Sequence, residues 1–153
     1  MGEVLRAEAL DSESAQQLLQ AFVDEIARLY PGWTAMSGPS AEPVDFEPPL
    51  GRFIVAYSEG EPVACGGLKP LGSGAAEIKR LYVTPHMRRR GLGRRMIGEL
   101  EGVAKTQGYA VVRLDTGAEQ PDAVRLFKAA GYREIADYNG NPFASHWFEK
   151  AFA

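Results

Sequence analysis

The sequence has little cysteine, little histidine and no long apolar run. Its single cysteine, Cys65, excludes an internal disulfide framework and fits a reducing compartment. Its two histidines, His86 and His146, are far apart and have no further ligands at metal-binding spacing, so we expect no metal site. No stretch approaches the roughly 20 apolar residues of a membrane helix, and the first residues lack a signal-peptide core. We therefore expect a cytoplasmic protein with no membrane partner.

Charge of either sign is also modest. The 153 residues carry 17 basic and 20 acidic side chains, a net charge of -3 that argues against general nucleic-acid binding. A chain of this length is expected to form one domain over residues 1–153. Against this background one basic cluster stands out, because residues 88–95 contain five of the 17 basic residues.

The apolar pattern predicts both helices and strands. Apolar residues recur at helical spacing over residues 15–29, 92–107 and 121–130. Strand patterns occupy residues 3–10, 53–57, 62–68, 76–83, 110–115, 132–136 and 145–152. Within them, Gly66 and Gly67 indicate a bulge or a close backbone approach. We expect an α/β (α+β) fold with a mixed, mostly antiparallel central sheet of about six to seven strands flanked by helices.

Residues 31–51 have no clear period and contain five prolines and three glycines. Such long irregular segments are uncommon inside a domain and are often functional. Two interpretations stay open: a surface loop, or a substrate-side wall that includes Trp33 and Phe46. Tyr138 is likewise either a pocket residue or core, whereas we expect Trp147 and Phe148 to belong to the core.

The basic cluster follows a strand and opens a helix. Residues 88–93 read RRRGLG, and the first N–H groups of a helix lack partners within it and attract anions. Gly91 and Gly93 lack a Cβ, so a phosphate can approach the backbone, and arginine forks suit phosphate oxygens. The sequence therefore predicts a pyrophosphate site at this loop.

These residues resemble a known family, the GNAT-type N-acetyltransferases. The acetyl-CoA motif of that family is Gln or Arg, two residues, Gly, one residue, then Gly or Ala, and Arg88, Gly91 and Gly93 match it. Residues 123–132, AVRLFKAAGY, resemble a later helix of the family. The resemblance covers roughly residues 50–150 and implies a GNAT-like fold and acetyl-CoA as co-substrate.

The resemblance also implies the positions that bind acetyl-CoA. The pantetheine arm would pair with the strand before the loop, as an added strand does, and the pyrophosphate would lie on the loop. The expected cofactor-binding residues are Leu81, Tyr82, Val83, Arg88, Arg89, Gly91, Leu92, Gly93, Arg94 and Gln120. Some of Arg89, Arg90 and Arg95 are expected to face solvent even so.

Two positions depart from the family pattern. Phe127 stands where the family often has a tyrosine that protonates the leaving thiolate, so that role is vacant. Gln120 stands where the family often has an asparagine, and it has a longer reach. Tyr132 and Tyr138 are alternative acids, although a structural role is commoner for tyrosine.

Amine acetylation requires a proton acceptor. A lysine-type amine with a pKa of about 10.4 is neutral in about one molecule in 2,500 at pH 7, a cost of roughly 4.6 kcal/mol, whereas an α-amino group costs only about 1–1.4 kcal/mol. Glu77, at the start of the strand before the loop, is the candidate catalytic base, and some members of the family carry their base there. The alternative is an exposed glutamate paired with a neighbouring Lys or Arg. A backbone N–H near Leu81 would serve the oxyanion.

The sequence thus favours an N-acetyltransferase that moves an acetyl group to a primary amine by direct attack in a ternary complex. The acceptor is a small-molecule or peptide amine, nucleic acid is not expected as a partner, and a homodimer is one candidate assembly. The alternative is a non-catalytic acyl-CoA-binding or sensor domain, which the phenylalanine at position 127 favours. A dinucleotide-binding site lacks its G-x-G-x-x-G fingerprint.

Overall fold

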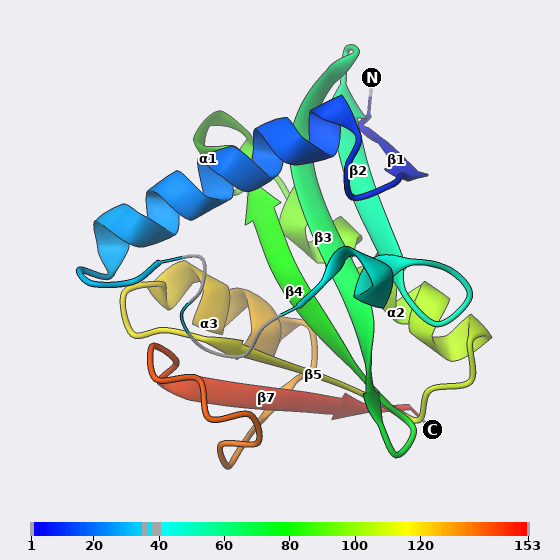
Figure 1. The fold of residues 1–153 in the computed structure, drawn as a ribbon, viewed down its shortest axis with the longest axis vertical. Coiled ribbons are helices and arrows are strands. Elements are labelled where there is room, and N and C mark those ends of the chain that lie inside the picture. Colours follow the sequence, from blue (N-terminus) through cyan, green and yellow to red (C-terminus); the bar gives the residue numbers. More distant parts are fainter. Residues whose placement is uncertain (1, 35–36, 38–40, 153) are drawn as a thin grey trace.

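A computed structural model describes residues 2–34, 37 and 41–152 (Figure 1). Within these residues the chain forms three α-helices and one sheet of seven strands in the order β1-β2-β3-β4-β5-β7-β6. Strands β4 and β5 run parallel, and the other neighbouring pairs run antiparallel. The predicted mixed, mostly antiparallel sheet is confirmed.

The strands lie close to the predicted segments. The main difference is the third strand, which extends beyond residue 68 because it forms a long hairpin with the fourth. The strands are β1 (Val4–Ala7), β2 (Arg52–Ser58), β3 (Glu61–Gly72), β4 (Ala75–Val83), β5 (Val111–Thr116), β6 (Arg133–Ile135) and β7 (His146–Ala151).

The helices begin and end at residues whose chemistry favours those positions. Helix α1 (Glu13–Leu29) is capped by Ser12, whose side chain accepts a hydrogen bond from the Ala15 N–H at 3.1 Å. Helix α3 (Pro121–Ala129) begins with a proline at its first turn. Helix α2 (Leu92–Thr106) is followed by Gly108, whose φ of 86° suits a glycine after a helix end.

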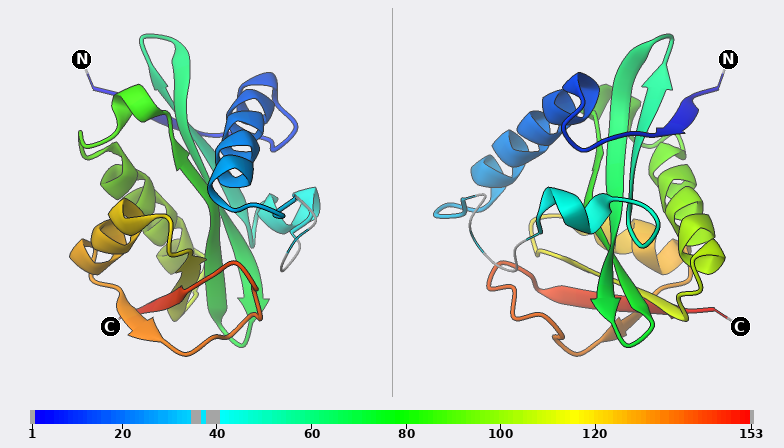
Figure 2. Two further views of the ribbon diagram at one scale, coloured as in Figure 1. Left: turned by 90° about the vertical axis from the view of Figure 1, so that its left-hand side faces the viewer. Right: turned by 45° about the vertical axis from the view of Figure 1, so that its right-hand side comes forward.

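The sheet separates two layers, each with its own apolar cluster (Figure 2). Helices α2 and α3 cover one face, where Met96, Ile97 and Leu100 pack on the strands. Helix α1 and the short 3-10 helix η1 (Pro43–Phe46) cover the other face. Here the Phe46 ring lies over Gly67, and a Cβ at that glycine would meet a ring carbon at 2.4 Å.

Phe46 therefore belongs to the core. Gly67 allows the Phe46 ring to lie against the backbone, which is the close approach predicted from the sequence. Phe148 is core as well. Trp147 differs from its prediction: it is half-buried, and its indole Nε1 donates a hydrogen bond to Asn139 Oδ1 at 3.0 Å. An indole N–H needs a polar partner, which draws this side chain to the edge of the core.

Strand β4 contains a bulge at Arg80. Cys65 pairs with Tyr82 and Gly67 pairs with Lys79, so two residues of β4 lie opposite one residue of β3. Arg80 has a φ of 59°, in the left-handed region. The extra residue changes which side chains face each layer: residues 76 and 78 face the α2 cluster before the bulge, and residues 81 and 83 face it afterwards.

Strands β4 and β5 separate soon after they begin. Their ladder pairs Ala75 with Val111 and Ala76 with Val112, and ends where Glu77 pairs with Arg113. From residue 78 onward β4 has β3 on one side and an edge without a ladder on the other. The point of divergence therefore places Glu77 at the inner end of a gap in the sheet.

Candidate active site

A cleft of about 1310 Å³ occupies the region where β4 and β5 diverge. Its walls come from β4, from β5 and the N-terminal part of α3, from the C-terminal half of α1 and from the loop before α2. Ligand pockets are commonly about 300–1,000 Å³ in volume, so this cleft has room for a large ligand. Of the residues predicted to bind a cofactor, those that line the cleft are Leu81, Tyr82, Val83, Arg88, Arg89, Gly91, Gly93, Arg94 and Gln120.

The N-terminus of α2 forms one end of the cleft. Gly91 is the N-cap residue, with a φ of 83° in the left-handed region, so a side chain there would be strained. Gly93 has a different reason: a Cβ there would meet Leu126 Cδ2 of α3 at 3.1 Å. The side chain of Leu92 is buried in the core, so only its backbone can face a ligand.

Three of the arginines in this loop already have carboxylate partners, so their guanidinium groups are not free to bind a ligand in the cleft. Arg88 donates two hydrogen bonds of 2.8 Å from Nη2 to the carboxylate of Glu25 on α1, and its Nε donates to Val83 O at 2.8 Å. Arg89 lies 3.4 Å from Asp122 on a well-exposed surface. Arg95 pairs with Glu3 beside β1, away from the cleft wall. At the α2 end of the cleft, the hydrogen-bond donors without a competing ion pair to the described residues are thus the backbone N–H groups and Arg94.

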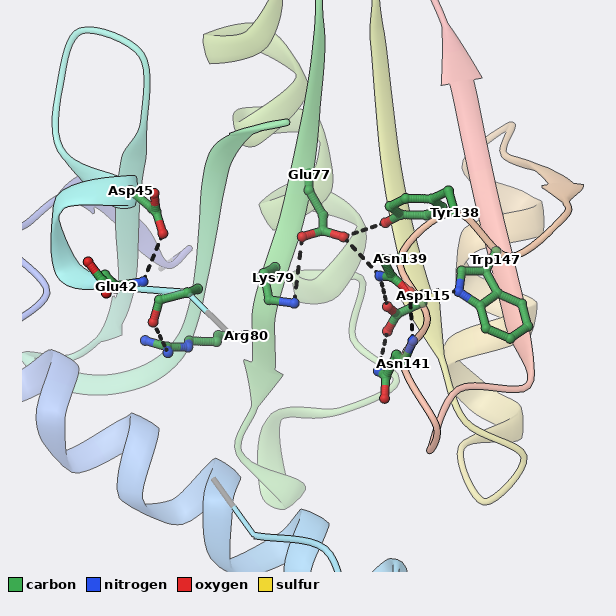
Figure 3. A network of polar contacts seen from close by, with 11 residues as sticks. Glu42, Asp45, Glu77, Lys79, Arg80, Asp115, Tyr138, Asn139, Asn141 and Trp147 are labelled. Atoms are coloured by element: carbon green, nitrogen blue, oxygen red, sulfur yellow. Dashed lines mark hydrogen bonds and ion pairs between the residues drawn. The ribbon is translucent and has the colours of Figure 1, made fainter. Parts of the chain in front are cut away.

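Glu77 lies on the cleft wall where the two strands part, and it is only 2% exposed. Tyr138 Oη donates to Glu77 Oε2 at 2.5 Å, and Asn139 Nδ2 donates to the same oxygen at 3.3 Å (Figure 3). Lys79 Nζ lies 3.5 Å from Oε1. The predicted pairing with a neighbouring lysine is present, but the expectation of an exposed side chain is wrong, because the loop between β6 and β7 covers Glu77.

The carboxylate of Glu77 therefore has two unequal oxygens. Oε2 accepts both hydrogen bonds, whereas Oε1 accepts none from the described residues and has only the Lys79 ammonium nearby. Burial, followed by the charge of Glu77, raises the pKa of Tyr138, so this hydroxyl keeps its proton and remains a donor. The two oxygens of Glu77 thus differ in their partners, and Oε1 is the one that faces Lys79.

A second carboxylate, Asp115 on β5, belongs to the same network. Asn139 Nδ2 donates to Asp115 Oδ2 at 2.5 Å, and Asn141 Nδ2 donates to Oδ1 at 3.3 Å. Because Trp147 donates to Asn139 Oδ1, the amide nitrogen of Asn139 must face the two carboxylates. Burial raises the pKa of Asp115, and its two amide hydrogen bonds and Lys79 partly oppose this. Asn139 thus holds Glu77 and Asp115 together.

Tyr30 closes the cleft on the side of α1. Its hydroxyl donates to Gln120 Oε1 at 3.0 Å and accepts from the Glu119 N–H at 3.1 Å, which ties the end of α1 to the start of α3. Gly117 permits this contact, because a Cβ there would lie 2.0 Å from the Tyr30 hydroxyl. The glutamine at position 120 therefore shapes the wall between the loop before α2 and the end of β5.

Comparison with known proteins agrees with this geometry. The chain matches the acetyltransferase (GNAT) family over residues 17–132. It belongs to that family. An N-acetyltransferase of Schizosaccharomyces pombe is 36% identical over 99 residues, an alignment that covers 63% of this chain and 61% of the relative. The chain thus spans less than two thirds of the length of that relative.

Solved structures share the GNAT fold over nearly the whole chain. A GNAT-family acetyltransferase of Staphylococcus aureus has a TM-score of 0.80 at 16% identity, over 98% of this chain and 99% of its own. The PaiA N-acetyltransferase of Thermoplasma acidophilum, solved with coenzyme A, has a TM-score of 0.75 at 17% identity, over 99% of this chain and 100% of its own. At such identities these likenesses establish the fold.

Phe127, at the position where GNAT proteins often carry a tyrosine, belongs to the core and also lines the cleft. Phe127 is buried, and its ring packs against Tyr132 and Phe148 at centroid distances of 6.2 and 5.9 Å. Tyr132 donates to Glu101 at 2.8 Å and does not line the cleft, so it is not placed to act as an acid. Tyr138 contacts Glu77 instead.

Sequence reasoning missed Asp115, Asn139, Asn141, Arg80 and Tyr30 as site residues. A charged residue near the end of a strand otherwise rich in apolar side chains was the available signal for Asp115. The two asparagines flank Gly140 and gave only a turn signal. Within the described residues, no helix is long and apolar enough to cross a membrane, and no group of three His, Cys, Asp or Glu residues could hold a metal ion.

Proposed function

We propose that this GNAT protein transfers an acetyl group from acetyl-CoA to a primary amine of a small molecule or peptide, by direct attack in a ternary complex. The observation that carries the proposal is the position of Glu77. Its buried carboxylate lies where β4 and β5 part, inside the cleft that also reaches the N-terminus of α2.

The residues of the cleft fit acetyl-CoA. Beyond Glu77 the edge of β4 has no ladder toward β5, so Leu81, Tyr82 and Val83 can offer backbone groups to the amides of a pantetheine arm. The glycine N-cap of α2 offers unpaired N–H groups to a pyrophosphate. Because Arg88 is bound to Glu25, backbone groups carry most of the phosphate binding in this proposal, with Arg94 as the added charge.

Glu77 accepts the proton of the acceptor amine. In this proposal Oε1 accepts the proton, because Tyr138 and Asn139 donate to Oε2 and fix the plane of the carboxylate. Bound acetyl-CoA supplies the activated acetyl thioester. A lysine-type amine is almost entirely protonated at pH 7, so a base that removes its proton in the complex offsets up to about 4.6 kcal/mol.

The bulge in β4 supplies donors for the acetyl oxygen. Arg80 and Leu81 fall outside the ladder with β3, and a bulge leaves the N–H of its extra residue unpaired. A backbone N–H aimed at the oxygen where charge develops stabilises it without reorganisation. Residue 127 cannot protonate the thiolate, and we assign no general acid.

The test is a thiol-release assay with acetyl-CoA over several classes of amine, together with calorimetric titration of acetyl-CoA. Micromolar binding and amine-dependent thiol release are expected. Failure to bind acetyl-CoA would refute the cleft assignment. Binding without thiol release from any amine class would instead favour an acyl-CoA-binding or sensor protein.

A further inference from the structure

Arg80 is a cation on the acceptor side of the cleft that the proposed chemistry does not use. It projects from the bulge of β4 into the same cleft as Glu77 and Lys79. In Figure 3 its side chain extends to the side away from Glu77, with Lys79 between them. Trp33 also lines this cleft, which adds apolar surface to its walls.

The guanidinium of Arg80 is held in place, but not by a carboxylate. Its Nη2 donates to Ala41 O at 3.2 Å, and its Cζ lies 5.3 Å from the centre of the Phe46 ring. Glu42 and Asp45 are nearby in η1 and its cap, yet no ion pair to Arg80 forms within the described residues. The positions outside the described ranges contain no Asp or Glu, so they cannot supply that partner.

The acidic side chains of this wall are engaged elsewhere. Glu77 is bound by Tyr138, Asn139 and Lys79, and Asp115 is bound by the two asparagines. Asp45 accepts a hydrogen bond of 2.8 Å from the Glu42 N–H. The guanidinium of Arg80 therefore has no ion pair to the described residues. Burial lowers its pKa, and the charges of Cys65 and Asp45 only partly oppose this.

We infer that the acceptor carries a carboxylate that binds Arg80 while its amine meets Glu77. This deepens the proposed acetyl transfer and rests on it. A guanidinium presents a rigid fork that matches a carboxylate in a bidentate manner. Nη2 uses one of its two N–H groups on Ala41 O. Its second N–H forms a fork with either Nη1 or Nε, which have no hydrogen bonds to the described residues, and this fork can bind an acceptor carboxylate.

The spacing of the two residues narrows the class of acceptor. Three residues of strand span at most about 10 Å between Cα atoms at roughly 3.3 Å per residue. Figure 3 shows the Arg80 side chain extending away from Glu77, with Lys79 between them, so the two side-chain heads are farther apart than neighbouring groups would be. In an α-amino acid the nitrogen and the carboxyl carbon are only about 2.5 Å apart, which is too short to bridge the two side chains in this arrangement. The acceptor class is an ω-amino carboxylate, in which several bonds separate the two groups.

The test compares matched acceptors in the thiol-release assay. Wild-type enzyme is offered 6-aminohexanoate, its primary amide, hexylamine and 1,6-diaminohexane, and kcat/KM is measured for each. The carboxylate is expected to exceed its amide by about 10- to 150-fold, the range for a hydrogen bond to a charged group. Arg80→Gln is expected to remove that preference, chiefly through KM, so that the ratio of kcat/KM for the carboxylate to kcat/KM for its amide falls to about one.

A matched control is Arg6→Gln, because Arg6 also stacks over an aromatic ring, with Cζ 4.2 Å from the Tyr57 centroid, but lies outside the cleft wall. This variant should keep the full preference.

Equal rates for the carboxylate and its amide in the wild type, or a preference retained in Arg80→Gln, would overturn the inference. If Arg80→Gln does not fold, the wild-type comparison still decides. Turnover of the diamine without a carboxylate preference defeats only this inference, whereas no turnover of any amine defeats the proposed function.

Discussion

Replacing Glu77 by glutamine separates its chemistry from its structural contacts. Tyr138 and Asn139 both donate to Oε2, so the carbonyl oxygen of a glutamine takes that position. Its amide nitrogen then replaces Oε1 and faces Lys79, whose Nζ lies 3.5 Å away in the wild type. The variant keeps the shape of the site and both hydrogen bonds, but it can no longer accept a proton.

The expected loss is large at neutral pH and shrinks as the pH rises. A positioned general base contributes about 10²- to 10⁴-fold, which is roughly 2.7–5.5 kcal/mol of barrier. That range includes the roughly 4.6 kcal/mol needed to deprotonate a lysine-type amine at pH 7. Without the base the variant depends on neutral amine, whose fraction rises about tenfold per pH unit below the amine pKa. The ratio of wild-type to variant kcat/KM should therefore fall steadily between pH 7 and 10.

The assay is thiol release at saturating acetyl-CoA, with the unfolding temperature measured for each variant. Glu101→Gln is the matched control, because Glu101 is also buried and accepts hydrogen bonds from a tyrosine and a lysine, Tyr132 at 2.8 Å and Lys150 at 3.1 Å, outside the cleft wall. It should keep wild-type rates at every pH. Unchanged activity of Glu77→Gln at pH 7, or a ratio that stays constant with pH, would refute the assignment of Glu77 as base.

Three further perturbations test other parts of the site. Gly91→Val forces a β-branched residue to a φ of 83° at the N-cap of α2 and should raise the acetyl-CoA Kd by about tenfold or more, at a strain of roughly 1–2 kcal/mol. Arg95→Ala, beside Glu3, should change that Kd little, and equal effects in calorimetry would contradict the backbone cradle. Asp115→Asn tests the penalty that burial places on the charged form of Asp115, whose pKa is raised in the folded state. The variant loses one of the two amide hydrogen bonds at all pH values, so the pH dependence is the test: its stability relative to wild type should be most favourable at pH 7 and should fall as the pH drops toward the unfolded carboxyl pKa of 3.8, below which Asp115 is protonated in both states. A stability difference in chemical denaturation that is independent of pH would refute this cause. Cys65→Ala should retain activity, because burial raises the pKa of that thiol to about 12 and keeps it protonated and unreactive. The lost side-chain packing should cost about 1 kcal/mol of stability. An inactive, folded variant would favour a covalent route.

Much of the fold could be predicted from local chemistry. Ser12 caps α1, Pro121 opens α3 and the apolar spacing of both helices gives their buried faces, so each element follows from neighbours within a few residues. Strands with β-branched residues between turn signals were found for the same reason. Trp147 was placed wrongly because apolar alternation does not reveal a polar partner eight residues away in a folded loop.

The candidate site likewise has residues that a local motif identified and contacts that only folding brings together. Gly91, Gly93 and the arginines lie in one short stretch, so their motif could be recognised before folding, and their role in binding acetyl-CoA stays a prediction. The occupancy of the Arg88 fork by Glu25 could not be foreseen, because 63 residues separate the two in the chain. The choice for residues 31–51 is partly decided: Trp33 lines the cleft, Phe46 is core, and residues 35–36 and 38–40 lie outside the described residues.

Local sequence patterns were enough to predict most elements of this protein, its family and the basic loop that opens α2, because all of these depend on residues close together in the chain. The tertiary structure alone decided which side chains meet at the point where β4 and β5 part. Strand order brings Asp115 beside Glu77. The loop before β7 places Tyr138 against Glu77 and Asn139 against both carboxylates. The burial and hydrogen bonding of Glu77 arise from contacts across about 60 residues, which no local pattern encodes.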